Sequence, residues 1–442
     1  MIRRRLSGGL WRSSHGVTTS WLNLHLSGSA GSLLKEEKKH ESYRLIRRAG
    51  FVDVKMKWVR DRGLDHAVEK EKHLRPTVAL KNLIKREPRR CLPVSIASEK
   101  KDELGLPTRA IEFIRRYPSV FEEFTDAAVG KRPLVRLTAE AIRLDEEEQR
   151  VLDSQKQDAA DRLLKLLMMT GEKRLPLRVI DQLMWDLGLP DDYARRLVPD
   201  FPDYFEIVDL GPPRHDPALE LVCWSKALAV SVMEKNAIKA DEGGYRKGMP
   251  LAFPMNFSTG FDLEKKVKRW VDEWQKLPYI SPYEDASHLH PKSDLGEKWM
   301  VGVLHELFHL FISKKTERNN VLALGEHLGF RPRFARAFAH HPGIFYVSNK
   351  LKTCTVILRE AYKRDLLIEK HPMLSMRFQY IRLLKMEADG GKNAAAVASA
   401  QSESSEDEKD EDDEESESDG DGDSSEWEKD ENLTAMTTTR TR

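Results

Sequence analysis

A short motif that occurs three times constrains the fold of this chain more than any other feature. Each copy begins with Leu-Gly, continues for about the length of one helix and ends in Pro-x-x-Phe. The copies start 83 and then 141 residues apart, so they predict divergent domains rather than a regular solenoid. They read ELGLPTRAIEFIRRYPSVFEEF (103–124), DLGLPDDYARRLVPDFPDYFEI (186–207) and HLGFRPRFARAFAHHPGIFYVS (327–348).

Two helices are predicted in each copy, one before and one after the Leu-Gly pair. In the first two copies a Leu-Pro pair stands 12 residues ahead of Leu-Gly, and the helix between them would end at a C-cap glycine. In the next helix apolar residues recur at i, i+3, i+4 and i+7, which indicates one buried face. These stripes are Ala110, Phe113, Ile114 and Tyr117 in the first copy, and Phe334, Ala337, Phe338 and His341 in the third.

A β-hairpin is predicted after each Pro-x-x-Phe, because β-branched and aromatic runs flank a turn there. The resulting order of helix, helix, helix and hairpin is that of a winged helix, a module that often contacts nucleic acid. We therefore expect a mainly α fold with short β-hairpins, built from three divergent winged-helix-like repeats at about 76–140, 138–225 and 295–370. Such modules also dock proteins, and a docking scaffold remains an alternative.

The charge is divided unevenly along the chain. Residues 402–432 contain 18 Asp and Glu against 2 Lys, a net charge of −16, while the rest has 71 basic and 54 acidic residues, or +17. Residues 388–442 have little apolar content, so we expect a disordered acidic tail. A remainder this basic suggests that the body, residues 36–387, has a polyanionic partner such as nucleic acid.

The first 35 residues have the composition of an organelle transit peptide. They contain no Asp or Glu, and arginines crowd the start at Arg3, Arg4, Arg5 and Arg12. This pattern favours mitochondria over chloroplasts. The longest apolar run, residues 221–233, is too short and too polar to span a bilayer.

The sequence HELFH (305–309) matches the His-Glu-x-x-His pattern of zinc peptidases. On a helix, His305 and His309 would face the same side and could bind zinc, while Glu306 would polarise the metal-bound water. A third ligand is poorly supplied, because the nearest candidates, Glu326 and His327, belong to the third repeat. We therefore expect two histidines on a structural helix, no metal and no catalytic residues, with a zinc metallopeptidase as the alternative.

The chain resembles the plant organelle RNA recognition (PORR) domain family over about residues 50–385. The resemblance rests on KWVRDRGLDHAVEKEKHL, LPVSIASEKKDELGLPTRAIEFIRRYPSVFEEF, GMPLAFPMNFSTGFDLEKKVKRWVDEWQKLPYISPYEDA and HLGFRPRFARAFAHHPGIFYVSNKLKTCTVILREAY. It implies organelle targeting, RNA binding and help with the splicing of group II introns, and it does not imply peptidase activity. Intron-containing RNA, and other splicing factors in a ribonucleoprotein, would then be the partners.

Lysine and arginine side chains would contact RNA phosphates in this interpretation, and no cofactor is required. First among them are arginines on the solvent faces of the motif helices. The predicted wings and the helix at 262–277 supply further clusters. The candidates are Arg109, Arg116, Arg333 and Arg336 on the helices, Lys131, Arg132, Lys350 and Lys352 in the wings, and Lys265, Lys266, Lys268 and Arg269.

Overall fold

The structure is a computed structural model that describes residues 58–126, 132–211, 215–240, 244–290, 292–351 and 353–397, with side chains up to residue 386. All of them belong to one of two compact units of the chain, Gly50–Arg442. The predicted transit peptide, the acidic tail beyond residue 397, and the candidates Lys131 and Lys352 lie outside the described residues.

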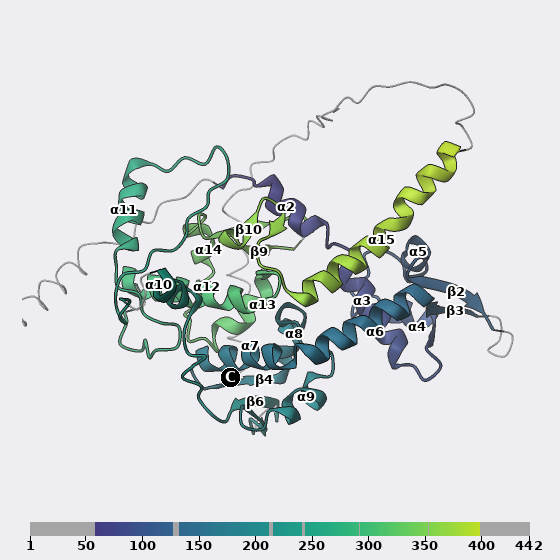
Figure 1. The fold of residues 1–442 in the computed structure, drawn as a ribbon, viewed down its shortest axis with the longest axis horizontal. Helices are drawn as coiled ribbons and strands as arrows, with labels where there is room; N and C mark the ends of the chain where they lie inside the picture. The colour runs from purple at the N-terminus through teal and green to yellow at the C-terminus, as the bar shows by residue number, and fades with distance from the viewer. Residues whose placement is uncertain are drawn as a thin grey trace, which may run out of the picture. The chain divides into compact units, whose positions relative to one another are not determined.

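One order of elements occurs three times: helix, short strand, two helices and a two-stranded hairpin (Figure 1). The first module contains α3 (Leu74–Arg86), β1 (Cys91–Pro93), α4 (Val94–Glu99), α5 (Ala110–Arg116), β2 (Phe121–Thr125) and β3 (Pro133–Leu137). The second contains α7 (Lys156–Met169), β4 (Arg174–Pro176), α8 (Leu177–Leu187), α9 (Tyr193–Arg196), η2 (Val198–Asp200), β5 (Phe205–Asp209) and β6 (Pro217–Leu221). The third contains α12 (Asp294–Leu310), β7 (Lys315–Glu317), α13 (Arg318–Gly325), α14 (Arg336–His340), β8 (Phe345–Ser348) and β9 (Thr355–Leu358).

Each module has its own antiparallel sheet of three strands. The orders are β1-β3-β2, β4-β6-β5 and β7-β9-β8, so the short first strand pairs with the second strand of the hairpin. In the first sheet Leu92 stands opposite Val135, and both side chains are fully buried. The predicted mainly helical fold with hairpins is confirmed, and the short strands are an addition that the sequence patterns did not predict.

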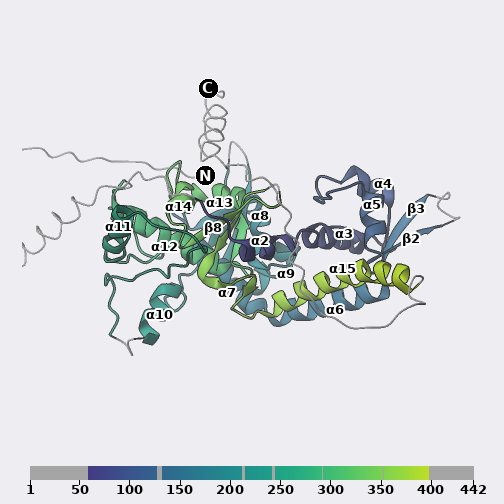
Figure 2. The same cartoon turned by 90° about the horizontal axis from the view of Figure 1, so that it is seen from above.

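The remaining elements connect or flank the modules. They are α2 (Arg62–Glu69), α6 (Ala139–Ser154), α10 (Val232–Ala240), α11 (Lys265–Gln275), η3 (Arg359–Ala361), β10 (Tyr362–Lys363), β11 (Leu366–Leu367) and α15 (Pro372–Val397). Figure 2 shows α15 lying along α6, which it contacts. Residues 388–397 continue α15 although disorder was predicted there; extending a formed helix adds a hydrogen bond per residue without a new nucleation cost. Across the described ranges, no helix combines the length and apolar character needed to cross a membrane.

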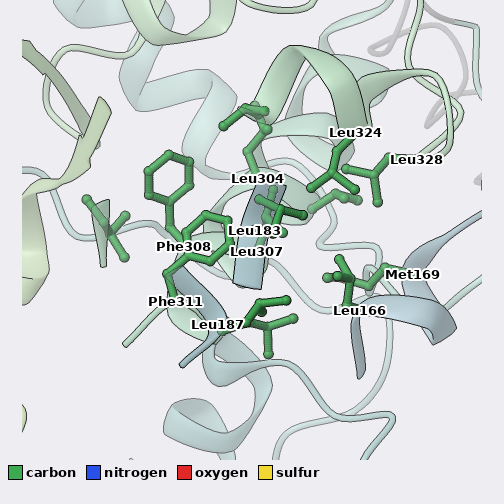
Figure 3. Close-up of a cluster of buried hydrophobic side chains, with 14 of the residues drawn as sticks. Leu166, Met169, Leu183, Leu187, Leu304, Leu307, Phe308, Phe311, Leu324 and Leu328 are labelled. Atoms are coloured by element: carbon green, nitrogen blue, oxygen red, sulfur yellow. The ribbon is translucent and has the colours of Figure 1, made fainter. Parts of the chain in front are cut away.

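The modules are held by two main hydrophobic cores. One joins the second and third modules, where helices α7, α8, α12 and α13 meet. Figure 3 shows part of it, with Leu166 and Met169 from α7, Leu183 and Leu187 from α8, Leu304, Leu307 and Phe308 from α12, and Leu324 from α13. The other core belongs to the first module and is completed by α6 and by α15, which contributes Met376, Tyr380, Ile381 and Leu383. The second and third modules therefore form one packed body, while the first packs against the chain's last described helix.

Candidate nucleic-acid interface and a histidine cluster

The first pair of predicted phosphate contacts lies on α5. Arg109 is the N-cap residue of this helix and is exposed, but its Nε donates to Oε1 of Glu112 over 2.8 Å. Arg116 lies in the last turn and is also exposed. The predicted stripe of Ala110, Phe113, Ile114 and Tyr117 is confirmed as buried. Arg109 is thus partly neutralised by its neighbour, whereas Arg116 is presented to solvent.

The helix predicted after Leu-Gly in the third module begins later in the structure than the sequence pattern indicated. α14 starts only at Arg336, and Arg333 stands before it in a turn with a φ of +76°. The left-handed backbone of Arg333 cannot be part of an α-helix, so the helix starts only after it. Phe334, outside the helix, is only half-buried. Arg333 and Arg336 each interact with another group of the protein. Arg109 and Arg333 do not occupy equivalent positions, and their helices pack in different cores.

The two described wing candidates differ in exposure and in pairing. Arg132 is exposed at the start of β3. Lys350 is half-buried in the turn after β8, and its ammonium lies 3.8 Å from the Glu69 carboxylate of α2. Lys350 is therefore a poorer candidate for a free phosphate contact than the sequence pattern predicted.

The third basic cluster lies on α11 and is the most accessible. Lys265, Lys266, Lys268 and Arg269 are all exposed on the N-terminal half of this helix. The opposite face is buried through Val267, Trp270 and Trp274, which fix the helix to the core. Within the described part of the chain none of these four cations has a hydrogen-bond or ion-pair partner. We call these four residues the α11 basic row.

The α11 basic row has no evident role in stabilising its own helix. Lys265 and Lys266 occupy the first turn, where the positive end of the helix dipole repels cations. Glu264 at the N-cap makes no capping hydrogen bond with its side chain. The row therefore concentrates positive potential at one exposed helix end, which suits a phosphate backbone.

The histidines of HELFH meet a third group that sequence reasoning missed. Nε2 of His305 lies 2.9 Å, and Nε2 of His309 2.7 Å, from the same oxygen of Glu360, Oε1. Glu360 comes from η3, directly after the third hairpin. Burial disfavours the ionised form of Glu360, but hydrogen bonds from the two histidines outweigh it and lower its pKa to about 2. Burial lowers the pKa of His309, so the cluster combines a carboxylate with neutral imidazole at neutral pH.

Glu306, the expected general base of a peptidase, is used elsewhere. It is fully buried, and its carboxylate accepts hydrogen bonds from Lys165 (2.5 Å), Tyr283 (2.8 Å) and the backbone of Val232 (2.7 Å). Burial raises the cost of ionising Glu306, but the Lys165 ammonium outweighs it and keeps the carboxyl pKa below its usual value. Glu306 thus ties α7 to α12 and has no free oxygen for activating water.

A third ligand was expected to be poorly supplied, but a carboxylate lies beside both histidines, and it is not one of the two named candidates. Neither Glu326 nor His327 belongs to the cluster; Glu360 does. No spacing rule could have found it, because Glu360 follows His309 by 51 residues and is brought close only by the folding of the third module.

Comparison with known proteins places the chain in context. Residues 59–389 match the plant organelle RNA recognition domain. The mitochondrial protein WHAT'S THIS FACTOR 9 of Arabidopsis thaliana is 41% identical over 348 residues, which cover 77% of this chain and 88% of that protein. The chloroplastic WHAT'S THIS FACTOR 1 of Zea mays is 33% identical over 321 residues, covering 71% and 64%. ROOT PRIMORDIUM DEFECTIVE 1 of Arabidopsis thaliana is 32% identical over 345 residues, covering 74% and 83%. No solved structure is significantly similar to the chain.

Proposed function

This chain belongs to the plant organelle RNA recognition family, and we propose that it is a mitochondrial RNA-binding protein that promotes the splicing of group II introns. Two observations favour mitochondria over chloroplasts. The first 35 residues are rich in arginine and free of acidic residues. Among the relatives, the mitochondrial one is 41% identical and the maize chloroplastic one 33% identical.

The α11 basic row carries the proposal at the level of residues. Four exposed cations that have no partner among the described residues offer contacts to phosphates, which set affinity without selecting sequence. Arg116 and Arg132 supply further exposed positive charge on the first module. The repeated helix, strand, helix, helix and hairpin order is that of a winged helix, which supports nucleic-acid recognition.

The protein does no covalent chemistry in this proposal. It binds the intron and favours the folded arrangement in which the RNA itself reacts. A ligand that binds one conformation better than another shifts the population only by its difference in affinity. The relevant property is therefore preferential binding of the splicing-competent RNA.

The test is to recover the RNA from the organelle. The tagged chain is immunoprecipitated from purified mitochondria, and the bound RNA is sequenced. We expect enrichment of a small set of intron-containing transcripts, and accumulation of the same transcripts unspliced in plants that lack the protein. Recovery of chloroplast transcripts would overturn the assignment to mitochondria. An absence of bound RNA would favour the docking-scaffold alternative.

A further inference from the structure

The cluster of His305, His309 and Glu360 has the composition and closeness of a metal site. One ligand atom from each residue lies within 4.8 Å of the others. Two imidazoles and one carboxylate are a common donor set for Zn²⁺, which usually takes four ligands. Donors held about 2.0–2.1 Å from a tetrahedral ion stand about 3.3 Å apart. The distances from the two Nε2 atoms to Glu360 Oε1, 2.9 and 2.7 Å, are about half an ångström shorter. The ion therefore fits once the side chains move apart by that amount.

Burial and unpaired atoms indicate that the cluster is incomplete without a further ligand. The side chain of His305 is 1% exposed, and those of His309 and Glu360 are 14% and 16% exposed. Two buried polar atoms, Glu360 Oε2 and His305 Nδ1, have no hydrogen-bond partner among the described residues. If Nε2 of His305 faces an ion without its proton, Nδ1 carries the ring proton. The partial exposure of His309 and Glu360 leaves a path for an ion and for a water as fourth ligand.

The three modules carry different groups at the equivalent positions of their first helix. These positions stand ten and six residues ahead of the first residue of the short strand. In the first module the two residues are lysines that pair with Asp145 and Glu148 of the helix after the hairpin. The positions hold Lys81 and Lys85 in the first module, Leu164 and Met168 in the second, and His305 and His309 in the third. The first and third modules thus both link this helix to an acidic group beyond the hairpin, and in the third the linking groups are two histidines.

We propose that His305, His309 and Glu360 bind one Zn²⁺ ion that ties α12 to the segment following β9. The site is structural rather than hydrolytic, because Glu306 is held by Lys165 and Tyr283 and cannot act on a bound water. The proposal is independent of RNA binding, since it concerns the internal stability of the third module.

The test measures zinc in the full chain. The purified protein is stripped with a chelator, reloaded with Zn²⁺, desalted and analysed for metal per chain, with affinity obtained by competition against a chromophoric chelator. We expect one ion per chain, a dissociation constant below about 1 μM, and a higher melting temperature with zinc than without. His309→Gln and Glu360→Gln should each weaken the affinity at least tenfold.

His340→Gln is the matched control, because His340 also lies near a buried glutamate of α12, Glu297, at 3.7 Å. It should bind zinc like the unaltered chain. Zinc held by the acidic tail or by other histidines is present in every variant and is subtracted. Cobalt loading of the unaltered chain gives a readout that needs no variant, since a tetrahedral site produces intense visible absorption bands. Absence of those bands, or equal zinc content in the unaltered chain and both ligand variants, would overturn the proposal.

Discussion

A basic residue in the left-handed backbone region stands directly before the short strand of every module. Arg90, Lys173 and Lys314 have φ angles of 53°, 58° and 52°. Such angles are unfavourable for residues with a Cβ. In two modules the long side chain offsets this by capping the preceding helix: Lys173 Nζ donates to the carbonyls of Met168 and Thr170, and Lys314 Nζ to that of His309. Sequence patterns could not predict these turns, because glycine or asparagine is the usual residue there.

Lys298 is a further lysine whose ammonium caps a helix end, and it gives a pH-dependent prediction. Its Nζ donates to the carbonyls of Gln275 and Leu277 at 2.7 Å each, at the end of α11. Burial lowers its pKa to about 8. Between pH 8 and about 10 the unfolded chain therefore binds more protons than the folded one, and this residue makes stability rise with pH by up to about 1.4 kcal/mol per unit.

We expect urea unfolding at pH 8, 9 and 10 to show this rise in the unaltered chain relative to Lys298→Met. The variant is less stable at every pH, because two half-buried carbonyl groups lose their donor. Other lysines titrate in both proteins and cancel. A stability difference that is constant from pH 8 to 10 would contradict the assignment.

Two glycines with the same backbone angle give a matched pair of variants. Gly105 and Gly188 have φ angles of 63° and 64°, but a Cβ on Gly105 would meet nothing within 4 Å, whereas one on Gly188 would lie 1.8 Å from Cδ1 of Ile312. We expect Gly105→Ala to cost about 1 kcal/mol of unfolding free energy from the angle alone. Gly188→Ala should cost a further 1–3 kcal/mol from overpacking. Equal losses in chemical denaturation would show that Ile312 moves aside freely.

At the scale of elements, periodic patterns were predictable and distant contacts were not. The stripe from Ala110 to Tyr117 and the C-cap at Gly188 followed from local spacing alone. The strands β1, β4 and β7 have three residues each and show no alternation that could be recognised. The late start of α14 and the position of Glu360 depend on how the third module folds. The α11 basic row was visible in the sequence, but its exposure and its lack of partners within the described ranges were not.

The α11 basic row gives the element-scale prediction. Replacing Lys265, Lys266, Lys268 and Arg269 together by Gln should weaken binding of all single-stranded RNAs alike. If each cation neutralises one phosphate, the slope of log affinity against log salt should flatten by about 2.8, four times the value of about 0.7 per contact. Melting temperature should change little, because Val267, Trp270 and Trp274 hold the buried face.

A matched control removes the same charge from arginines that already have carboxylate partners. Arg115, Arg136 and Arg143 are exposed and Arg174 is half-buried; they pair with Glu123, Glu122, Glu140 and Glu172, respectively. Their fourfold replacement by Gln should leave most of the salt slope in place. If both quadruple variants lose affinity equally, binding depends on net charge and not on the α11 basic row.

At the scale of the whole molecule, the acidic segment 402–432 opposes the basic body. Its net charge of −16 nearly balances the +17 of the remainder. We expect the segment to compete with RNA for the basic surface at low salt, where charges are least screened. Deleting residues 398–442 should raise RNA affinity at 50 mM salt more than at 200 mM, as measured by fluorescence anisotropy. Identical binding curves for both proteins at both salt concentrations would rule out this competition.

The dependence of the first module on α15 has a consequence for how the chain reaches its folded state in a cell. Lys81 of α3 bonds the hydroxyl of Tyr380, 299 residues later, and α15 supplies four side chains to the first core. A chain that emerges from the ribosome, or from an import channel, with its N-terminus first exposes this unfinished core until α15 arrives. The second and third modules share a core that lacks α15, and they can close earlier. A protein truncated before residue 372 would thus expose hydrophobic surface on its first module. Chaperones and quality-control proteases recognise such surface.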